Sequence, residues 1–482
     1  MLNKGETAES SPSDSSGFEW IQLDSIGFKW IHGFRWIHMD SADSDDPSTK
    51  SSSNSQAFKR LQFVYLIGYV LASAGNNLQG PYRYALYDSY DRQRSTIQRL
   101  YLVAGLSTLF LGTIVSSLAD KYGRRSACIL CGLVYILTCA TLNINILWIL
   151  YLGNISRGIA HSLYNANFEA WLIQDHHNNG LSTDSLKQIL RNAFVLSSIS
   201  AIAIGFISQF SVELLGLGYV APIDIAIGVY VIMIVFISTQ WTENYGDKEA
   251  SNTTSFVHAF QALRDDLRIV LVGLITALFD ATIYIFVIEW TPALQHASKW
   301  TIYEPLPLGI IFSCHMLFMM IGSFAFKPLS KRFQVQSYML VIILLTGVAL
   351  AMPVIFPNVQ PAVIVSFFVY EFCVGVYQPS ISLLRSQYLP DSTRGTLMNY
   401  FNIPRCALFF AVTFWQFPLT VIFAYCSAML LVAFVCLLIL RSMKAPDEHI
   451  VPSENVALLP ETTSQASDGI DNKSTSININ NE

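Results

Sequence analysis

The sequence is short of charged residues. Only 13% of its 482 residues are Asp, Glu, Lys or Arg, compared with roughly 25% in soluble globular domains. It also lacks a basic block suited to nucleic acid, a Gly/Lys loop that would cradle phosphates, and an HExxH or comparable metal motif. These absences argue against a nucleic-acid-binding protein, an ATP-driven pump, a soluble enzyme and a resident cofactor.

Cysteine is present but offers little chemistry. All eight cysteines lie inside apolar stretches, and only Cys128 and Cys131 form a CxxC pair. No second pair or nearby histidine accompanies that pair, so packing is favoured over metal or redox chemistry.

Long apolar segments dominate what is there. Hydrophobic residues make up 52% of the chain, and the mean hydropathy is +0.42. A helix needs about 20 mostly apolar residues to cross the hydrocarbon layer. Twelve segments meet this requirement and predict an all-α membrane protein: 61–79, 97–118, 126–144, 146–173, 190–213, 218–240, 268–291, 308–327, 337–356, 361–385, 396–416 and 418–441. Two of the connections, after 144 and after 416, are very short.

Polar segments divide the chain. Residues 1–57 and 445–482 are rich in Ser, Asn, Asp and Thr, which is typical of disordered tails. The polar stretch 241–267 reads as a linker between six-helix bundles at 58–240 and 268–444. The halves echo each other, because Arg191 and Arg405 are separated by the same 214 residues as Arg157 and Glu371. This pattern is expected of two parallel six-helix repeats.

Basic residues in the short loops predict the orientation. One set of loops carries most of them: Lys121, Arg124, Arg125, Lys187, Arg264, Arg268, Lys327, Lys331, Arg332 and Arg394. The first loop of the opposite set is an exception, with Arg83, Arg92, Arg94 and Arg99. We therefore expect both termini in the cytoplasm and, as first choice, the cell membrane. The stretch 454–459 fits an acidic dileucine sorting signal, so an endosomal or lysosomal membrane is the alternative.

One loop carries a family signature. Between the second and third segments the chain reads Ser116-Ser-Leu-Ala-Asp120-Lys121-Tyr122-Gly123-Arg124-Arg125. Gly123 permits a tight turn, Asp120 can pair with a cation or a helix N-terminus, and Arg124 and Arg125 can hold the loop at an anionic leaflet. The loop resembles the gating signature of the major facilitator superfamily and departs from it only at Ser116, where the pattern has Gly. The resemblance implies the major facilitator fold.

A closer resemblance covers residues 60–445. Five short segments resemble the eukaryotic molybdate-anion transporter family: 79–82 (QGPY), 168–171 (FEAW), 243–245 (ENY), 290–292 (WTP) and 307–313 (PLGIIFS). The family pattern carries Glu at the position of Asp280, so the acid is kept but shortened. The resemblance implies cellular uptake of molybdate, a tetrahedral dianion, by alternating access, and we expect a monomer in the lipid bilayer.

Arginines inside spans are candidate anion ligands. A charge within a span costs several kcal/mol and calls for a partner or a cavity. The guanidinium fork suits an oxyanion, so we predict Arg157, Arg405 and Arg191 as ligands, with the amide of Asn77 as a fourth. The alternatives are that Arg157 neutralises Glu169 or Glu371, that Arg191 is a plain interfacial arginine, and that Asn77 belongs to an exposed helix end. His161 is expected to pack.

Carboxylates inside spans suggest proton symport. Carrying a dianion into a negative interior costs about 4.6 kcal/mol per 100 mV, which two co-transported protons would remove. Buried carboxylates can bind protons near neutrality, so Glu169, Asp280 and Glu371 are the candidate proton sites. The alternative is static pairing with the arginines.

Two other functions stay open at this point. The cargo could be another small anion or nutrient, such as sulfate or an organic acid, because sequence does not separate tetrahedral oxyanions of equal charge. The chain could also be a transport-inactive membrane receptor or scaffold.

Overall fold

The computed structural model describes residues 47–245, 260–298, 306–390, 394–415 and 417–443. Within these ranges, the side chains of 47–54, 113, 116–120, 394–395 and 399 lie outside the description. The chain divides into two units, Met1–Ser52 and Ser53–Glu482, and the helix bundle belongs to the second. The described residues form helices and no strand.

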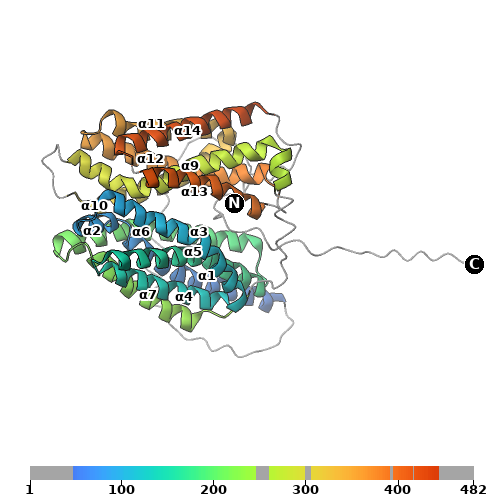
Figure 1. Ribbon diagram of the computed structural model, residues 1–482. Helices are drawn as coiled ribbons and strands as arrows, with labels where there is room; N and C mark the ends of the chain where they lie inside the picture. The colour runs from blue at the N-terminus through green and yellow to red at the C-terminus, as the bar shows by residue number, and fades with distance from the viewer. Residues whose placement is uncertain (1–46, 246–259, 299–305, 391–393, 416, 444–482) are drawn as a thin grey trace, which may run out of the picture. The chain divides into compact units, whose positions relative to one another are not determined.

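The first group of helices runs to residue 240. Its elements are α1 (Pro47–Leu78), α2 (Arg83–Ser89), α3 (Arg94–Tyr122), α4 (Arg124–Leu142), α5 (Leu147–Asn178), α6 (Thr183–Gln209), the π-helical turn η1 (Phe210–Leu214) and α7 (Ala221–Gln240). Helix α5 packs against α3 and α4, and α4 packs against α7. These helices lie together in Figure 1, coloured blue to green.

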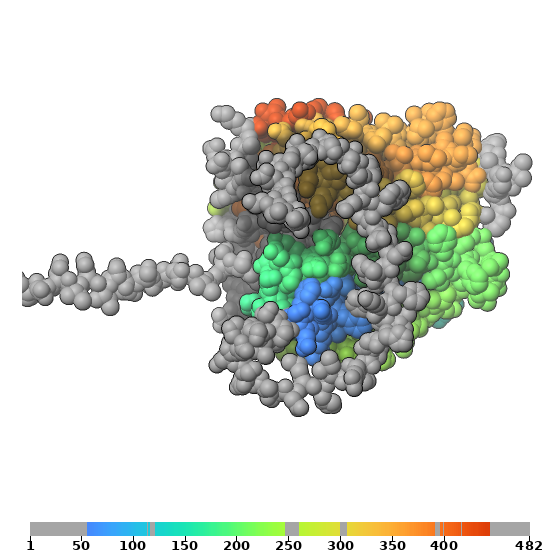
Figure 2. Space-filling model, turned by 180° about the vertical axis from the view of Figure 1, so that it is seen from behind, coloured from blue at the N-terminus to red at the C-terminus, as the bar shows by residue number. Residues whose placement is uncertain are grey.

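The second group begins at residue 267. Its elements are α9 (Leu267–Ser298), α10 (Leu308–Arg332), α11 (Val335–Ile355), α12 (Gln360–Tyr388), α13 (Arg394–Trp415) and α14 (Leu419–Ser442). Helix α12 packs against α9, α10 and α11, while α14 packs against α9 and α11. Figure 2 shows the same division on the surface, where blue-to-green atoms and yellow-to-red atoms form separate regions.

The predicted spans coincide with the long helices. Each of the twelve segments falls on one of the twelve described helices of 19 or more residues, and the short connection predicted after 144 is present, at 143–146. The other predicted connection includes residue 416, which lies outside the described residues. Helix α1 begins earlier than expected, so residues 47–57 are helical although the sequence placed them in a tail. Eight of the described helices are long and apolar enough to cross a membrane; α1, α3, α5 and α13 are the long helices outside that set.

Among the described residues, the two groups meet chiefly where α6 packs on α10, α3 on α13, and α2 on α9. The α6–α10 pair is especially close. A Cβ added at Gly205 would lie 2.5 Å from the carbonyl oxygen of Gly309. Small residues let membrane helices approach at backbone distance, where dispersion contacts stabilise the pair.

Candidate functional site

Two arginines, one from each helix group, lie over aromatic rings. The Arg157 guanidinium of α5 is 5.4 Å from the centre of the Tyr101 ring of α3, and Arg405 of α13 is 4.6 Å from the Tyr284 ring of α9. Arg405 also donates a hydrogen bond of 3.2 Å to the Tyr284 hydroxyl. An aromatic face partly compensates a cation that has left water. Both guanidinium groups are therefore held in place without an ion-paired carboxylate among the described residues.

The two arginines converge on His161. This side chain lies one helical turn after Arg157 on α5 and interacts electrostatically with both Arg157 and Arg405. Among the described residues Arg157 makes no hydrogen bond and no ion pair, so neither Glu169 nor Glu371 neutralises it here. The sequence predicted a packing role for His161, and its electrostatic interaction with Arg405 comes from the position of α13.

The other predicted ligands lie apart from this pair. Arg191 is exposed near the start of α6, as a plain interfacial arginine would be. Asn77 is half-buried on α1, and its amide donates a 3.2 Å hydrogen bond to Ser73 Oγ. Neither is among the groups that act electrostatically on His161.

The three predicted proton sites have different surroundings. Asp280 of α9 forms an ion pair of 3.6 Å with Arg385 of α12, and both residues are buried. Arg385 was missed from the sequence, because it closes the predicted span 361–385 and there looks like an interfacial residue. Glu371 is 8% exposed and makes no hydrogen bond or ion pair within the described parts of the chain. Glu169, also buried, acts electrostatically on Tyr65 and Tyr69 of α1 and belongs to a third neighbourhood.

The signature loop forms a tight turn between α3 and α4. Gly123 has φ of 114°, a conformation that strains any residue with a Cβ. Arg124 donates a 3.0 Å hydrogen bond to the Ala170 carbonyl, and Arg125 donates to the Ser238 carbonyl. These arginines therefore fasten the turn to α5 and α7, in addition to any contact with lipid headgroups. The side chain of Asp120 lies outside the described residues.

Glu243 caps the helix that follows this turn. Its carboxylate accepts hydrogen bonds from the backbone N–H of Arg125 at 2.9 Å, and from the N–H and hydroxyl of Ser126 at 3.2 and 2.6 Å. Neighbouring residues hold the segment in place, because the Trp171 indole donates 2.8 Å to the Thr242 carbonyl. A carboxylate at a helix N-terminus satisfies orphan N–H groups and opposes the helix dipole. In the sequence, Glu243 stood out only as part of the segment 243–245 that resembles the molybdate-anion transporter family.

At the bundle end opposite the signature loop, an ion pair joins the two groups. Arg94 of α3 donates to one Glu289 oxygen from Nε at 3.1 Å and from Nη2 at 2.7 Å, and Gln98 donates to the other at 2.6 Å. Arg94 also donates a 3.3 Å bond to the Phe417 carbonyl. Glu289 is 1% exposed. This cluster ties α3 to α9 and to the turn before α14.

Gln209 makes a second connection at that end. Its carboxamide oxygen accepts from the Tyr82 hydroxyl at 2.9 Å and from the Gly309 N–H at 3.0 Å. The latter bond satisfies an N–H in the first turn of α10, where no intrahelical partner exists. The helix groups are thus closed against each other at this end.

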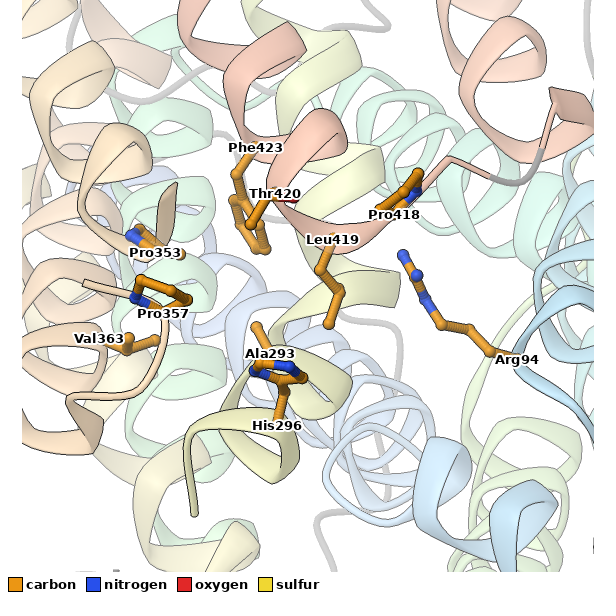
Figure 3. A pocket seen from close by; sticks show the side chains of 10 residues that line it. All are labelled: Arg94, Ala293, His296, Pro353, Pro357, Val363, Pro418, Leu419, Thr420 and Phe423. Atoms are coloured by element: carbon orange, nitrogen blue, oxygen red, sulfur yellow. The ribbon is translucent and has the colours of Figure 1, made fainter. Parts of the chain in front are cut away.

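One pocket of about 300 Å³ opens beside this closed end. Proline, leucine and phenylalanine side chains at or near the ends of α11 and α14 form half of its lining, and Arg94 and His296 also line it (Figure 3). Neither Arg157 nor Arg405 lines it. Nor do the described residues contain a group of three or more His, Cys, Asp or Glu side chains that could hold a metal ion.

The chain is similar to known membrane transporters. A family described as sugar transporters with 12 transmembrane spans matches residues 42–377. The molybdate-anion transporter of Xenopus tropicalis is 27% identical over 429 residues, covering 85% of this chain and 92% of that protein. The molybdate-anion transporter of Danio rerio is 29% identical over 388 residues, covering 74% and 79%. Among solved structures, the nucleoside transporter NupG aligns with a TM-score of 0.62 at 13% identity, covering 80% of this chain and 100% of that one; this likeness concerns the fold alone.

Proposed function

This chain belongs to the major facilitator family of twelve-span sugar transporters, which are multi-pass membrane proteins, and we propose that it takes up molybdate, or a tetrahedral oxyanion of the same charge, by alternating access. The observation that carries the proposal is that Arg157 and Arg405, each held over an aromatic ring of its own helix group, both act electrostatically on His161. The two arginines come from different helix groups, as a site at the repeat interface requires. The names of the similar proteins point to the same cargo.

Charge favours an anion over a neutral cargo. Each guanidinium carries five N–H donors and no acceptor, and Arg157 spends none of its donors on the described residues. A cation within a membrane span costs several kcal/mol, and a bound dianion would offset that cost for both arginines. A sugar, the cargo in the family's description, would bring no negative charge to offset that cost.

Proton symport is the second part of the proposal. Glu371 is the best supported of the three candidate proton sites, because it is buried without a described partner. Asp280 is ion-paired with the buried Arg385, so protonation of Asp280 would remove the charge that stabilises this pair. We therefore rank Glu371 before Glu169 and Asp280 as the proton site. Two protons per dianion would remove an electrical cost of about 4.6 kcal/mol per 100 mV.

Alternating access needs an end that opens. We assign the Arg94–Gln98–Glu289 cluster as the external gate, with both chain termini and the signature loop on the cytoplasmic side of the cell membrane. Arg191 and Asn77 remain proposed as ligands used in other conformations of the cycle.

Uptake by the purified protein in liposomes tests this function. Molybdate uptake is measured for the wild type and for Arg157→Gln and Arg405→Gln, with sulfate and glucose as competitors and an imposed pH gradient. Arg99→Gln, which removes an exposed positive charge of α3, is the matched control. We expect the wild type and the Arg99→Gln control to take up molybdate, and both test variants to lose this uptake.

Each alternative result would contradict one part of the proposal. Wild-type uptake blocked by glucose but not by sulfate would assign a sugar carrier. Uptake that ignores the pH gradient would remove proton coupling. No uptake of any cargo by a folded protein would favour the receptor or scaffold.

A further inference from the structure

Arg83, the first residue of α2, is buried inside the first helix group. It is 2% exposed, and one of its terminal nitrogens donates to the Gln79 carboxamide oxygen. Its Nε and its other terminal nitrogen have no partner among the described residues. The sequence placed Arg83 in an external loop as an exception to the orientation rule, yet its depth is that of a core residue.

A polar network fixes the direction of this guanidinium. The Gln79 amide donates 3.2 Å to the Gly75 carbonyl and 3.3 Å to the Tyr230 hydroxyl. This arrangement turns the carboxamide oxygen of Gln79 towards Arg83. The Tyr230 ring in turn stacks on Tyr135, with ring centres 4.8 Å apart. The Arg83 side chain is therefore positioned by Gln79, which is itself held by Gly75 and Tyr230.

The helix registers bring Arg83 beside Arg157. Tyr87, one turn after Arg83, accepts a 2.9 Å hydrogen bond from the Asn154 amide, and Arg157 lies about one turn after Asn154 on α5. Both arginines act electrostatically on each other and on the same two rings, Tyr101 and Tyr135.

The described residues supply no free counter-ion to this pair. Two carboxylates act on the surrounding rings and thiol: Glu289 on Tyr101, and Asp224 on Cys139. Glu289 is already ion-paired with Arg94, and Asp224, which accepts a 2.9 Å bond from Asn143, is exposed. Buried like charges repel in a low dielectric. A bound anion would relieve the repulsion between Arg83 and Arg157.

We propose that Arg83 and Arg157 form an oxyanion site within the first helix group, with the three free N–H bonds of Arg83 and the guanidinium of Arg157 as donors. It takes a small tetrahedral dianion, such as molybdate or sulfate. The site rests on the proposed transport function and extends it. Because Arg157 acts electrostatically on Arg83 and, together with Arg405, on His161, the anion would pass from an outer station beneath the external gate to the central station without leaving Arg157.

The test uses thermal denaturation of the purified full-length protein, with molybdate or sulfate titrated in. Arg83→Met removes the charge and keeps the length. We expect its melting temperature without anion to equal or exceed that of the wild type, because an unpaired buried cation is gone. We expect at least a tenfold loss of apparent affinity for both anions. Arg99→Gln should match the wild type in both measurements.

Two further variants separate the possible outcomes. Arg83→Lys keeps the charge but loses the planar guanidinium group, and should also bind the anions at least tenfold more weakly. This variant replaces Arg83→Met in the test if Arg83→Met does not fold. Arg405→Met should lose transport and keep binding at the outer station. If Arg83→Met lowers the melting temperature while anion affinity stays at the wild-type value, Arg83 is structural and the inference is wrong. If the wild type binds no oxyanion, the proposed function itself fails.

Discussion

Neutralising Glu289 should open the gate between the helix groups. The substitution Glu289→Gln keeps the shape of the side chain and removes the charge that Arg94 and Gln98 share. The bond from Gln98 can re-form to the new amide oxygen. The ion pair with Arg94 cannot.

The magnitude follows from the bonds that change. Glu289 accepts two hydrogen bonds from Arg94, at 2.7 and 3.1 Å. Bonds to charged groups are worth about 1.5–3 kcal/mol each. The Arg94 side chain is 27% exposed, so water can partly replace the carboxylate. A net loss of about 2 kcal/mol would shift the closed-to-open equilibrium at this end on the order of 30-fold.

Distance measurement between spin labels would detect this shift. Gln93→Cys and Asn358→Cys place labels on exposed positions at the closed end, one in each helix group. The half-buried Cys314 and Cys406 are replaced by serine in this background, since the other six native cysteines are buried. Glu289→Gln should add a longer-distance population that the parent protein lacks.

A matched variant controls for charge alone. Asp88 is an exposed carboxylate at the same end and accepts a 3.2 Å bond from Gln295 in the other helix group. Asp88→Asn should leave the distances unchanged, because exposed polar contacts contribute little. Identical distance distributions for Glu289→Gln and the parent would refute the reasoning that this pair holds the end closed.

Three other predictions concern stability. Glu243→Gln should lower the free energy of unfolding by about 1 kcal/mol, because the α4 cap loses its charge; an unchanged melting temperature would contradict the capping role. Burial raises the pKa of Asp266, but hydrogen bonds and attraction from Arg268 lower it further, so the pKa is below its ordinary value. The stabilisation is therefore present above the ordinary carboxyl pKa and lost as pH falls through the lowered one. The difference in melting temperature between wild type and Asp266→Asn should be present at pH 7 and disappear below about pH 4. A difference independent of pH would contradict the stabilising role of the Asp266 charge. Finally, Asp280→Asn should destabilise by about 3 kcal/mol by breaking the buried ion pair with Arg385, and adding Arg385→Met should recover part of the loss; additive losses in a double-mutant cycle would show that the two do not interact.

The helices could be predicted from the sequence because the bilayer restricts them. A chain in hydrocarbon must satisfy every backbone group internally, so each crossing is one long apolar helix. This held even for α5 and α13, which are less apolar than most because they carry Arg157 and Arg405. A polar residue in such a helix marks its inward face without ending the span.

The site was predicted only in part. Arg157 and Arg405 stood out because a cation within a span needs a reason. Arg83 and Arg94 did not, since both lie in what the sequence presents as one external loop with the exposed Arg99. Whether an arginine there is buried, paired or free depends on which other helices cover it.

The sequence by itself determined the approximate positions of the twelve long helices and the family loop around Gly123, because these follow from residues near one another along the chain. The tertiary structure decided the partners of the charges: Glu289 meets Arg94 across 195 residues, and Asp280 meets Arg385. It also decided that His161 interacts electrostatically with both Arg157 and Arg405. Such pairings are set by helix packing and depth, which the local pattern of apolar and polar residues leaves undetermined.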